Sequence, residues 1–116
     1  PEVIEHLLPP ASVDELWIFF PDPWHKKKHT KRRLVTAEFA ALAASVLHPG
    51  GVLRLATDWQ DYADQMRSVL DAAPGFTRAF EGDWAPRFDG RVLTAFERKG
   101  ERAGREIRDL TYRRST

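Results

Sequence analysis

Residues 16–33, with the sequence LWIFFPDPWHKKKHTKRR, place an apolar run directly before a proline-flanked acid and a cluster of cations. The run from Leu16 to Phe20 carries no polar residue, which is typical of a strand buried on both faces in a parallel sheet. Pro21 and Pro23 fix their own φ angles and restrict the residues before them, so Asp22 lies on stiff backbone. We therefore predict a buried strand that ends at a rigidly held carboxylate.

The cations after Asp22 form a basic run, residues 26–33. This run holds six of the 18 lysines and arginines, and the remainder then has 12 cations against 17 acids, a net charge of −5. It lies just before a predicted helix, at the positive end of the macrodipole, so local stability does not explain it. A solvated charged loop is the alternative, but clustered cations are typical of phosphate-binding surfaces, and we expect a polyanion partner.

The composition is that of one domain at most. With 116 residues, 42% apolar and 30% charged, the chain is ordinary for a soluble globular protein. No apolar segment approaches the ~20 residues that cross a bilayer, so we expect no membrane partner. The lack of cysteine fits a reducing cytosol, and we expect a cytoplasmic location. The absence of cysteine excludes disulfides and thiolate zinc sites.

Helix and strand patterns alternate along the chain. Apolar residues at helical spacing predict one helix after the candidate N-cap Thr36 and another after Asp58. A turn at residues 48–51 is expected to separate the first helix from a strand at 52–57. Candidate strands at 76–80 and 92–98 should pair antiparallel, and a short final strand is expected at 107–112. The helix stripes are Phe39, Leu42, Ala43, Val46 and Leu47, then Tyr62, Met66, Val69, Leu70 and Ala73.

This order predicts an α/β fold with parallel strands, crossover helices and antiparallel edge strands. Right-handed crossovers place the loops after the first two strands at the carboxyl edge of the sheet, where ligands bind. Asp22 and Asp58 follow those strands, so we expect both to contact a ligand. The alternatives are that Asp22 only ends a turn and that Asp58 is a helix N-cap. Trp24 is expected to cover the site or to stack on a base.

Other patterns carry less information. His25 and His29 have the i, i+4 spacing of a metal pair, but no third ligand is evident, and we predict no metal site. Residues 94–98 alternate as an ordinary edge strand would. The chain has neither a Gly-x-Gly-x-x-Gly loop nor a phosphate-binding loop.

The segment around Asp22 resembles the signature of the bacterial tRNA (guanine-N(7)-)-methyltransferases. The shared motif is Phe-Phe-Pro-Asp-Pro-Trp-His-Lys-Lys at residues 19–27, followed by Pro-Gly-Gly at 49–51, Ala-Thr-Asp-Trp at 56–59 and Thr-Ala-Phe-Glu-Arg at 94–98. The resemblance implies a Rossmann-like fold that uses S-adenosylmethionine to methylate nitrogen seven of the variable-loop guanosine of tRNA. The family's glycine-rich cofactor loop has no counterpart here. Residues 1–116 therefore resemble a single partial domain, the carboxyl-terminal half, and we expect the isolated chain to bind the cofactor poorly and not to turn over.

The resemblance also implies roles for individual residues. Asp22 matches the catalytic acid, which lies beside the methyl donor and so also contacts the cofactor. Two further sets match positions that bind the substrate and the RNA. The substrate-binding set is Lys26, Asp58, Thr94, Ala95, Phe96 and Glu97, and the RNA-binding set is Lys28, His29, Thr30, Lys31, Arg32 and Arg33.

Two other functions stay open from the residues alone. Pro-Asp-Pro-Trp loosely resembles the Asp/Asn-Pro-Pro-aromatic motif of methyltransferases that act on exocyclic amines. A non-catalytic RNA-binding module is compatible with the missing cofactor loop. By the resemblance to the carboxyl-terminal half of the guanine family, the sheet lacks its first strands, and we expect the open edge to favour self-association.

Overall fold

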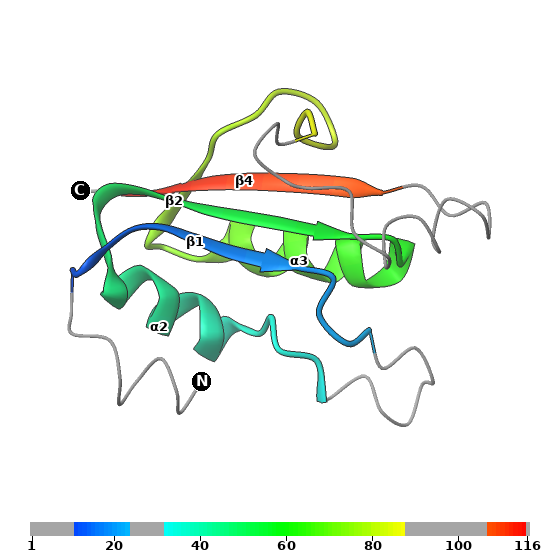
Figure 1. Ribbon diagram of the computed structural model, residues 1–116, viewed down its shortest axis with the longest axis horizontal. Helices are drawn as coiled ribbons and strands as arrows, with labels where there is room; N and C mark the ends of the chain where they lie inside the picture. Colours follow the sequence, from blue (N-terminus) through cyan, green and yellow to red (C-terminus); the bar gives the residue numbers. More distant parts are fainter. Residues whose placement is uncertain (1–10, 24–31, 88–106, 116) are drawn as a thin grey trace.

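A computed structural model describes residues 11–23, 32–87 and 107–115. The described residues form one four-stranded sheet and two helices (Figure 1). The elements are β1 (Val13–Phe19), α2 (Ala37–Val46), β2 (Leu47–Thr57), α3 (Gln60–Ala72), β3 (Phe76–Arg78) and β4 (Arg108–Arg114). The predicted alternation of helix and strand, and with it the α/β class, is confirmed.

The sheet has the order β1-β2-β4-β3, with one parallel pair and two antiparallel pairs. β1 runs parallel to β2, and β4 runs antiparallel to both β2 and β3. The predicted final strand is confirmed as β4, but it lies inside the sheet and not at its edge, where its Leu110 and Tyr112 are almost fully buried. The strand predicted at 92–98 lies outside the described residues.

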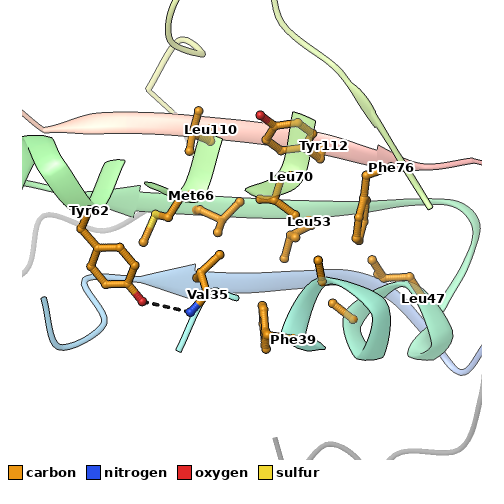
Figure 2. Close-up of a cluster of buried hydrophobic side chains, with 13 residues drawn as sticks. Val35, Phe39, Leu47, Leu53, Tyr62, Met66, Leu70, Phe76, Leu110 and Tyr112 are labelled. Atoms are coloured by element: carbon orange, nitrogen blue, oxygen red, sulfur yellow. Dashed lines mark hydrogen bonds between the residues drawn. The ribbon is translucent and has the colours of Figure 1, made fainter. Parts of the chain in front are cut away.

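The core lies on the one face of the sheet that α2 and α3 cover. Figure 2 shows Leu53 of β2 and Tyr112 of β4 among the buried side chains of both helices. Successive strand residues point to opposite faces, so Leu16 and Ile18 of β1 pack onto this core while Trp17 between them is 50% exposed. The prediction that β1 is buried on both faces is therefore wrong for the described residues, since no described helix covers the face of Trp17.

The junction of α2 and β2 differs in part from its prediction. Thr36 is confirmed as the N-cap of α2, because its Oγ1 accepts a 3.2 Å hydrogen bond from the Phe39 amide. The predicted turn at 48–51 is wrong: β2 begins at Leu47, directly after α2, and the pairing with β1 shifts register within this stretch. Glycine at position 51 allows the backbone to pass close to the His48 carbonyl oxygen, since a Cβ at this position would lie 2.8 Å from that oxygen.

Candidate functional site at the carboxyl edge of the sheet

The structure places Asp22 and Asp58 at the same edge of the sheet. In the parallel pair, Phe19 at the end of β1 lies opposite Ala56 of β2. Asp58 directly follows β2, and Asp22 comes three residues after the end of β1. The Asp22 residue is exposed, whereas Asp58 is half-buried. The predicted position of both acids, beyond the carboxyl ends of neighbouring parallel strands, is thus confirmed, and this is where open α/β sheets bind ligands.

The turn that carries Asp22 begins with an unusual backbone conformation. Phe20 has a φ of 54°, in the left-handed region that an aromatic residue rarely adopts, and it precedes a proline. Its amide donates a 2.8 Å hydrogen bond to the Ala56 carbonyl oxygen, which extends the β1–β2 pairing by one residue. Strained backbone persists only where the surrounding structure holds it, and it is often found at functional sites.

Asp58 is not the N-cap of α3. The helix has Trp59 as its N-cap, with no side-chain hydrogen bond to cap it. The Trp59 amide instead donates to Thr57 Oγ1 at 3.3 Å. The alternative role considered for Asp58, capping the following helix, is therefore wrong.

Arg33, expected to bind RNA, has its guanidinium enclosed by protein. Its side chain is 3% exposed and pairs with Asp61, with 2.7 Å between Nη2 and Oδ2. Nη1 donates to Gln65 Oε1 at 3.0 Å, and Nε donates to the Pro23 carbonyl oxygen. The neighbouring Arg32 is exposed. Of this adjacent pair, only Arg32 is an exposed residue.

Helix α3 also holds the backbone that follows Arg33. The Tyr62 hydroxyl accepts a 3.1 Å hydrogen bond from the Val35 amide (Figure 2), and Gln65 Nε2 donates to the Val35 carbonyl oxygen at 2.9 Å. Burial raises the pKa of Tyr62; the Val35 amide and Arg33 oppose this rise, and the Asp22 charge adds to it. Tyr62 is therefore neutral at physiological pH and serves this network as a hydrogen-bond acceptor.

No pattern in the sequence singled out Asp61 or Gln65 as site residues. They lie 28 and 32 residues from Arg33 along the chain. Their i, i+4 spacing puts them on the same face of a helix, but it does not name their partner. The network could be identified only once α3 was placed beside the segment that precedes α2.

Most of the predicted nucleic-acid contacts lie outside the described residues. These are Trp24, Lys26, Lys28, His29, Thr30, Lys31, Thr94, Ala95, Phe96 and Glu97, together with the His25 position considered for a metal. Within residues 11–23, 32–87 and 107–115, no group of three or more His, Cys, Asp or Glu side chains could hold a metal ion. In the same ranges, no helix combines the length and apolar character needed to cross a membrane.

Comparisons with known proteins agree with this geometry. A family model described as "Putative methyltransferase" matches residues 1–110. A tRNA (guanine-N(7)-)-methyltransferase of Nocardioides sp. is 61% identical over 109 residues, which cover 94% of this chain and 42% of the relative. A protein of the same name from Pseudomonas aeruginosa is 51% identical over 114 residues, covering 97% of this chain and 47% of the relative. The chain thus spans less than half the length of these curated relatives.

A solved structure shows the same fold at low sequence identity. The SAM-dependent O-methyltransferase of Thermotoga maritima superposes with a TM-score of 0.51 and 13% identity. The match covers 100% of this chain and 38% of the other. The predicted methyltransferase type of α/β fold is thereby confirmed.

Proposed function

We propose that this chain forms part of an enzyme that methylates tRNA, because it belongs to the methyltransferase family whose model matches residues 1–110. The reaction is transfer of a methyl group from S-adenosylmethionine to nitrogen seven of a variable-loop guanosine. The observation that carries the proposal is the position of Asp22 and Asp58, which follow neighbouring parallel strands at the ligand-binding edge, with the basic run beginning four residues after Asp22. The names of the relatives support the choice of reaction.

Asp22 is the proposed catalytic residue. Nitrogen seven of guanine has a free lone pair at neutral pH, so methyl transfer needs positioning more than a general base. The base becomes cationic as it is methylated. A fixed carboxylate can accept hydrogen bonds from the donor edge of guanine and stabilise the developing positive charge. Because the Asp22 residue is exposed, its carboxylate can reach such a ligand.

The same carboxylate fits a position beside the methyl donor. S-adenosylmethionine, when bound, supplies a methyl group attached to a positively charged sulfur atom. An acid at the end of β1 attracts a cation there, and an exposed carboxylate has oxygen atoms available to accept hydrogen bonds. Asp22 is thus proposed to orient the guanine and to contact the cofactor.

The basic run is proposed to hold tRNA phosphates. Arg32 is exposed and directly precedes Arg33, which binds the Pro23 carbonyl oxygen, and Lys26, Lys27, Lys28 and Lys31 share its charge. Electrostatic contacts of this type supply most of the affinity for nucleic acids. The remaining assignments stay proposals from resemblance: His29 and Thr30 in the RNA-binding segment, and Lys26, Asp58, Thr94, Ala95, Phe96 and Glu97 at the substrate.

Analysis of the methylated nucleoside tests this function. An intact enzyme that contains this chain is incubated with unmodified tRNA and S-adenosylmethionine, and the digested product is analysed by mass spectrometry. We expect 7-methylguanosine from the variable loop. A nucleoside methylated on an exocyclic amine would replace the proposal by the other methyltransferase class, and tRNA binding without any methylation would favour the RNA-binding module.

The edge position of β1 supports a further part of the proposal, self-association. β1 is the terminal strand of the described sheet, and an edge strand can pair with another chain. Sedimentation of the 116-residue chain over a range of concentrations tests this, with a constant monomer mass as the contradicting result.

A cytoplasmic location is proposed because tRNA modification takes place there, and fractionation of cells would check it.

A further inference from the structure

The buried guanidinium of Arg33 joins the two loops that carry the candidate acids. It donates to the carbonyl oxygen of Pro23, the residue after Asp22, and to the carboxylate of Asp61, three residues after Asp58. We propose that Arg33 is a positioning residue that fixes the Asp22 turn relative to the start of α3 and to Asp58. The structural part of this proposal stands by itself, and its catalytic consequence rests on the proposed function.

The Asp22 turn needs support from outside because it has few hydrogen-bond donors of its own. Pro21 and Pro23 have no amide N–H group, so Asp22 carries the only backbone hydrogen-bond donor of residues 21–23. On the strand side, the turn is held by the hydrogen bond from the Phe20 amide to the Ala56 carbonyl oxygen. On the other side, Arg33 binds the Pro23 carbonyl oxygen. Asp22 therefore lies between two anchors, and Arg33 supplies the second.

The geometry at Arg33 suits a guanidinium and not an amine. Nε, Nη1 and Nη2 donate in three fixed directions to three acceptors, and Cζ lies 4.8 Å from the centre of the Tyr62 ring. A lysine amine is a point charge that cannot reproduce this planar arrangement. A phosphate contact, by contrast, would tolerate lysine. Arg33→Lys therefore separates the positioning role from the RNA-binding role predicted from the sequence.

Hydrogen exchange of the 116-residue chain tests the structural part without any substrate. In Arg33→Lys, we expect the Phe20 amide to exchange at least about tenfold faster than in the unchanged chain, while amides in the middle of β4 change little. Arg78→Lys is the matched control: Arg78 pairs with Asp71 and donates to the Gly82 carbonyl oxygen. Equal exchange at Phe20 in both variants and the unchanged chain would overturn the proposal.

A second variant covers the case in which Arg33→Lys fails to fold. Gln65→Ala removes one of the three acceptors of Arg33 and leaves the guanidinium and Asp61 in place. We expect this variant to remain folded and to show a smaller acceleration at Phe20. No change at Phe20 in folded Gln65→Ala, together with an unfolded Arg33→Lys, would assign Arg33 a general stabilising role and would contradict the proposal.

Kinetics of an intact enzyme that contains this chain test the catalytic consequence. We expect Arg33→Lys to lower kcat by about 10-fold to 100-fold, since small misplacements of a catalytic group have effects of that size. The KM for tRNA and the salt dependence of tRNA binding should stay close to those of the unchanged enzyme. An unchanged kcat would overturn the positioning role, because a phosphate contact tolerates lysine and a guanidinium held by three acceptors does not. If the unchanged enzyme does not methylate tRNA, the proposed function fails, while the exchange experiment still decides the role of Arg33.

Discussion

The Tyr112 hydroxyl donates a 2.7 Å hydrogen bond to Asp71 Oδ1, which joins β4 to the last turn of α3. The Tyr112 ring is fully buried in the core, and Asp71 also pairs with Arg78, the last residue of β3. This contact fixes the end of α3 against the antiparallel part of the sheet. The start of the same helix holds the Asp22 turn through Arg33, so α3 links the core to the candidate site.

Removal of this hydroxyl should destabilise the fold. We expect Tyr112→Phe to lower the free energy of unfolding by about 1–2 kcal/mol, because a hydrogen bond to a charged acceptor is lost while the ring stays buried. Urea denaturation at neutral pH measures the change. Ser45→Ala, which removes an exposed hydroxyl from α2, is the control and should change the free energy by less than about 0.5 kcal/mol. Equal stability of the two variants would contradict the expectation.

The pairing of Asp71 predicts a loss of stability in acid. Its hydrogen bond from Arg78, together with the bond from Tyr112, holds the pKa of this carboxyl below its usual value of about 3.9. The folded state then binds fewer protons than the unfolded state, so the contribution is full above that value and is lost as the pH falls through the folded pKa. Glu15, whose pKa is lowered by the Trp17 indole and Arg54, acts in the same direction.

Denaturation at a series of pH values between 7 and 2 checks this effect. We expect Asp71→Asn to be less stable than the unchanged chain at pH 7 and to lose less stability in acid. The double variant Asp71→Asn, Glu15→Gln should show a still flatter dependence on pH. A variant curve parallel to that of the unchanged chain would show that Asp71 does not carry the effect.

Gly51 should be intolerant of a side chain. A Cβ at this position would lie 2.8 Å from the His48 carbonyl oxygen and 3.0 Å from that of Asp14, and both are backbone atoms that cannot easily move. We expect Gly51→Ala to cost about 1–3 kcal/mol of stability, measured by urea denaturation. Gly82→Ala is the comparison, since Gly82 has a φ of +77° but open space around its Cβ position, and it should cost about 1 kcal/mol. A smaller loss at Gly51 than at Gly82 would contradict the close approach.

Asp22→Asn should separate binding from catalysis in an intact enzyme that contains this chain. The amide keeps the shape of the side chain but loses the negative charge and part of the acceptor capacity. We expect tRNA affinity to stay within a few-fold and turnover to fall by about 10²-fold or more. Single-turnover methylation measures the effect, and Asp14→Asn, at the opposite end of β1, is the control. Unchanged turnover in Asp22→Asn would exclude the proposed electrostatic role.

Arg32 should contribute to tRNA binding through a phosphate. We expect Arg32→Ala to weaken binding and to reduce the slope of log affinity against log salt by roughly 0.7 to 0.9, the value for one contact. Filter binding at several salt concentrations provides the slope. Arg32→Lys is the control, because lysine keeps the positive charge and should leave the slope unchanged. A slope unaffected by Arg32→Ala would show that Arg32 does not contact phosphate.

Local patterns in the sequence determined the α/β order, the N-cap at Thr36 and the position of both acids. Each depends on residues close together in the chain: a hydroxyl three residues before an amide, a helical stripe, or an acid within three residues of the end of an apolar strand. The order of elements then placed Asp22 and Asp58 at the same edge, because parallel strands end on the same side of a sheet.

Only the tertiary structure decided the place of β4 and the surroundings of Arg33. β4 lies between β2 and β3, and Tyr112 reaches Asp71 across 41 residues of sequence. In the sequence, Arg33 is one of six clustered cations; in the fold, its three acceptors come from the Asp22 turn and α3. Charge and periodicity specify which residues can bind or be buried, but the partners of a side chain depend on which distant segments the packing brings together.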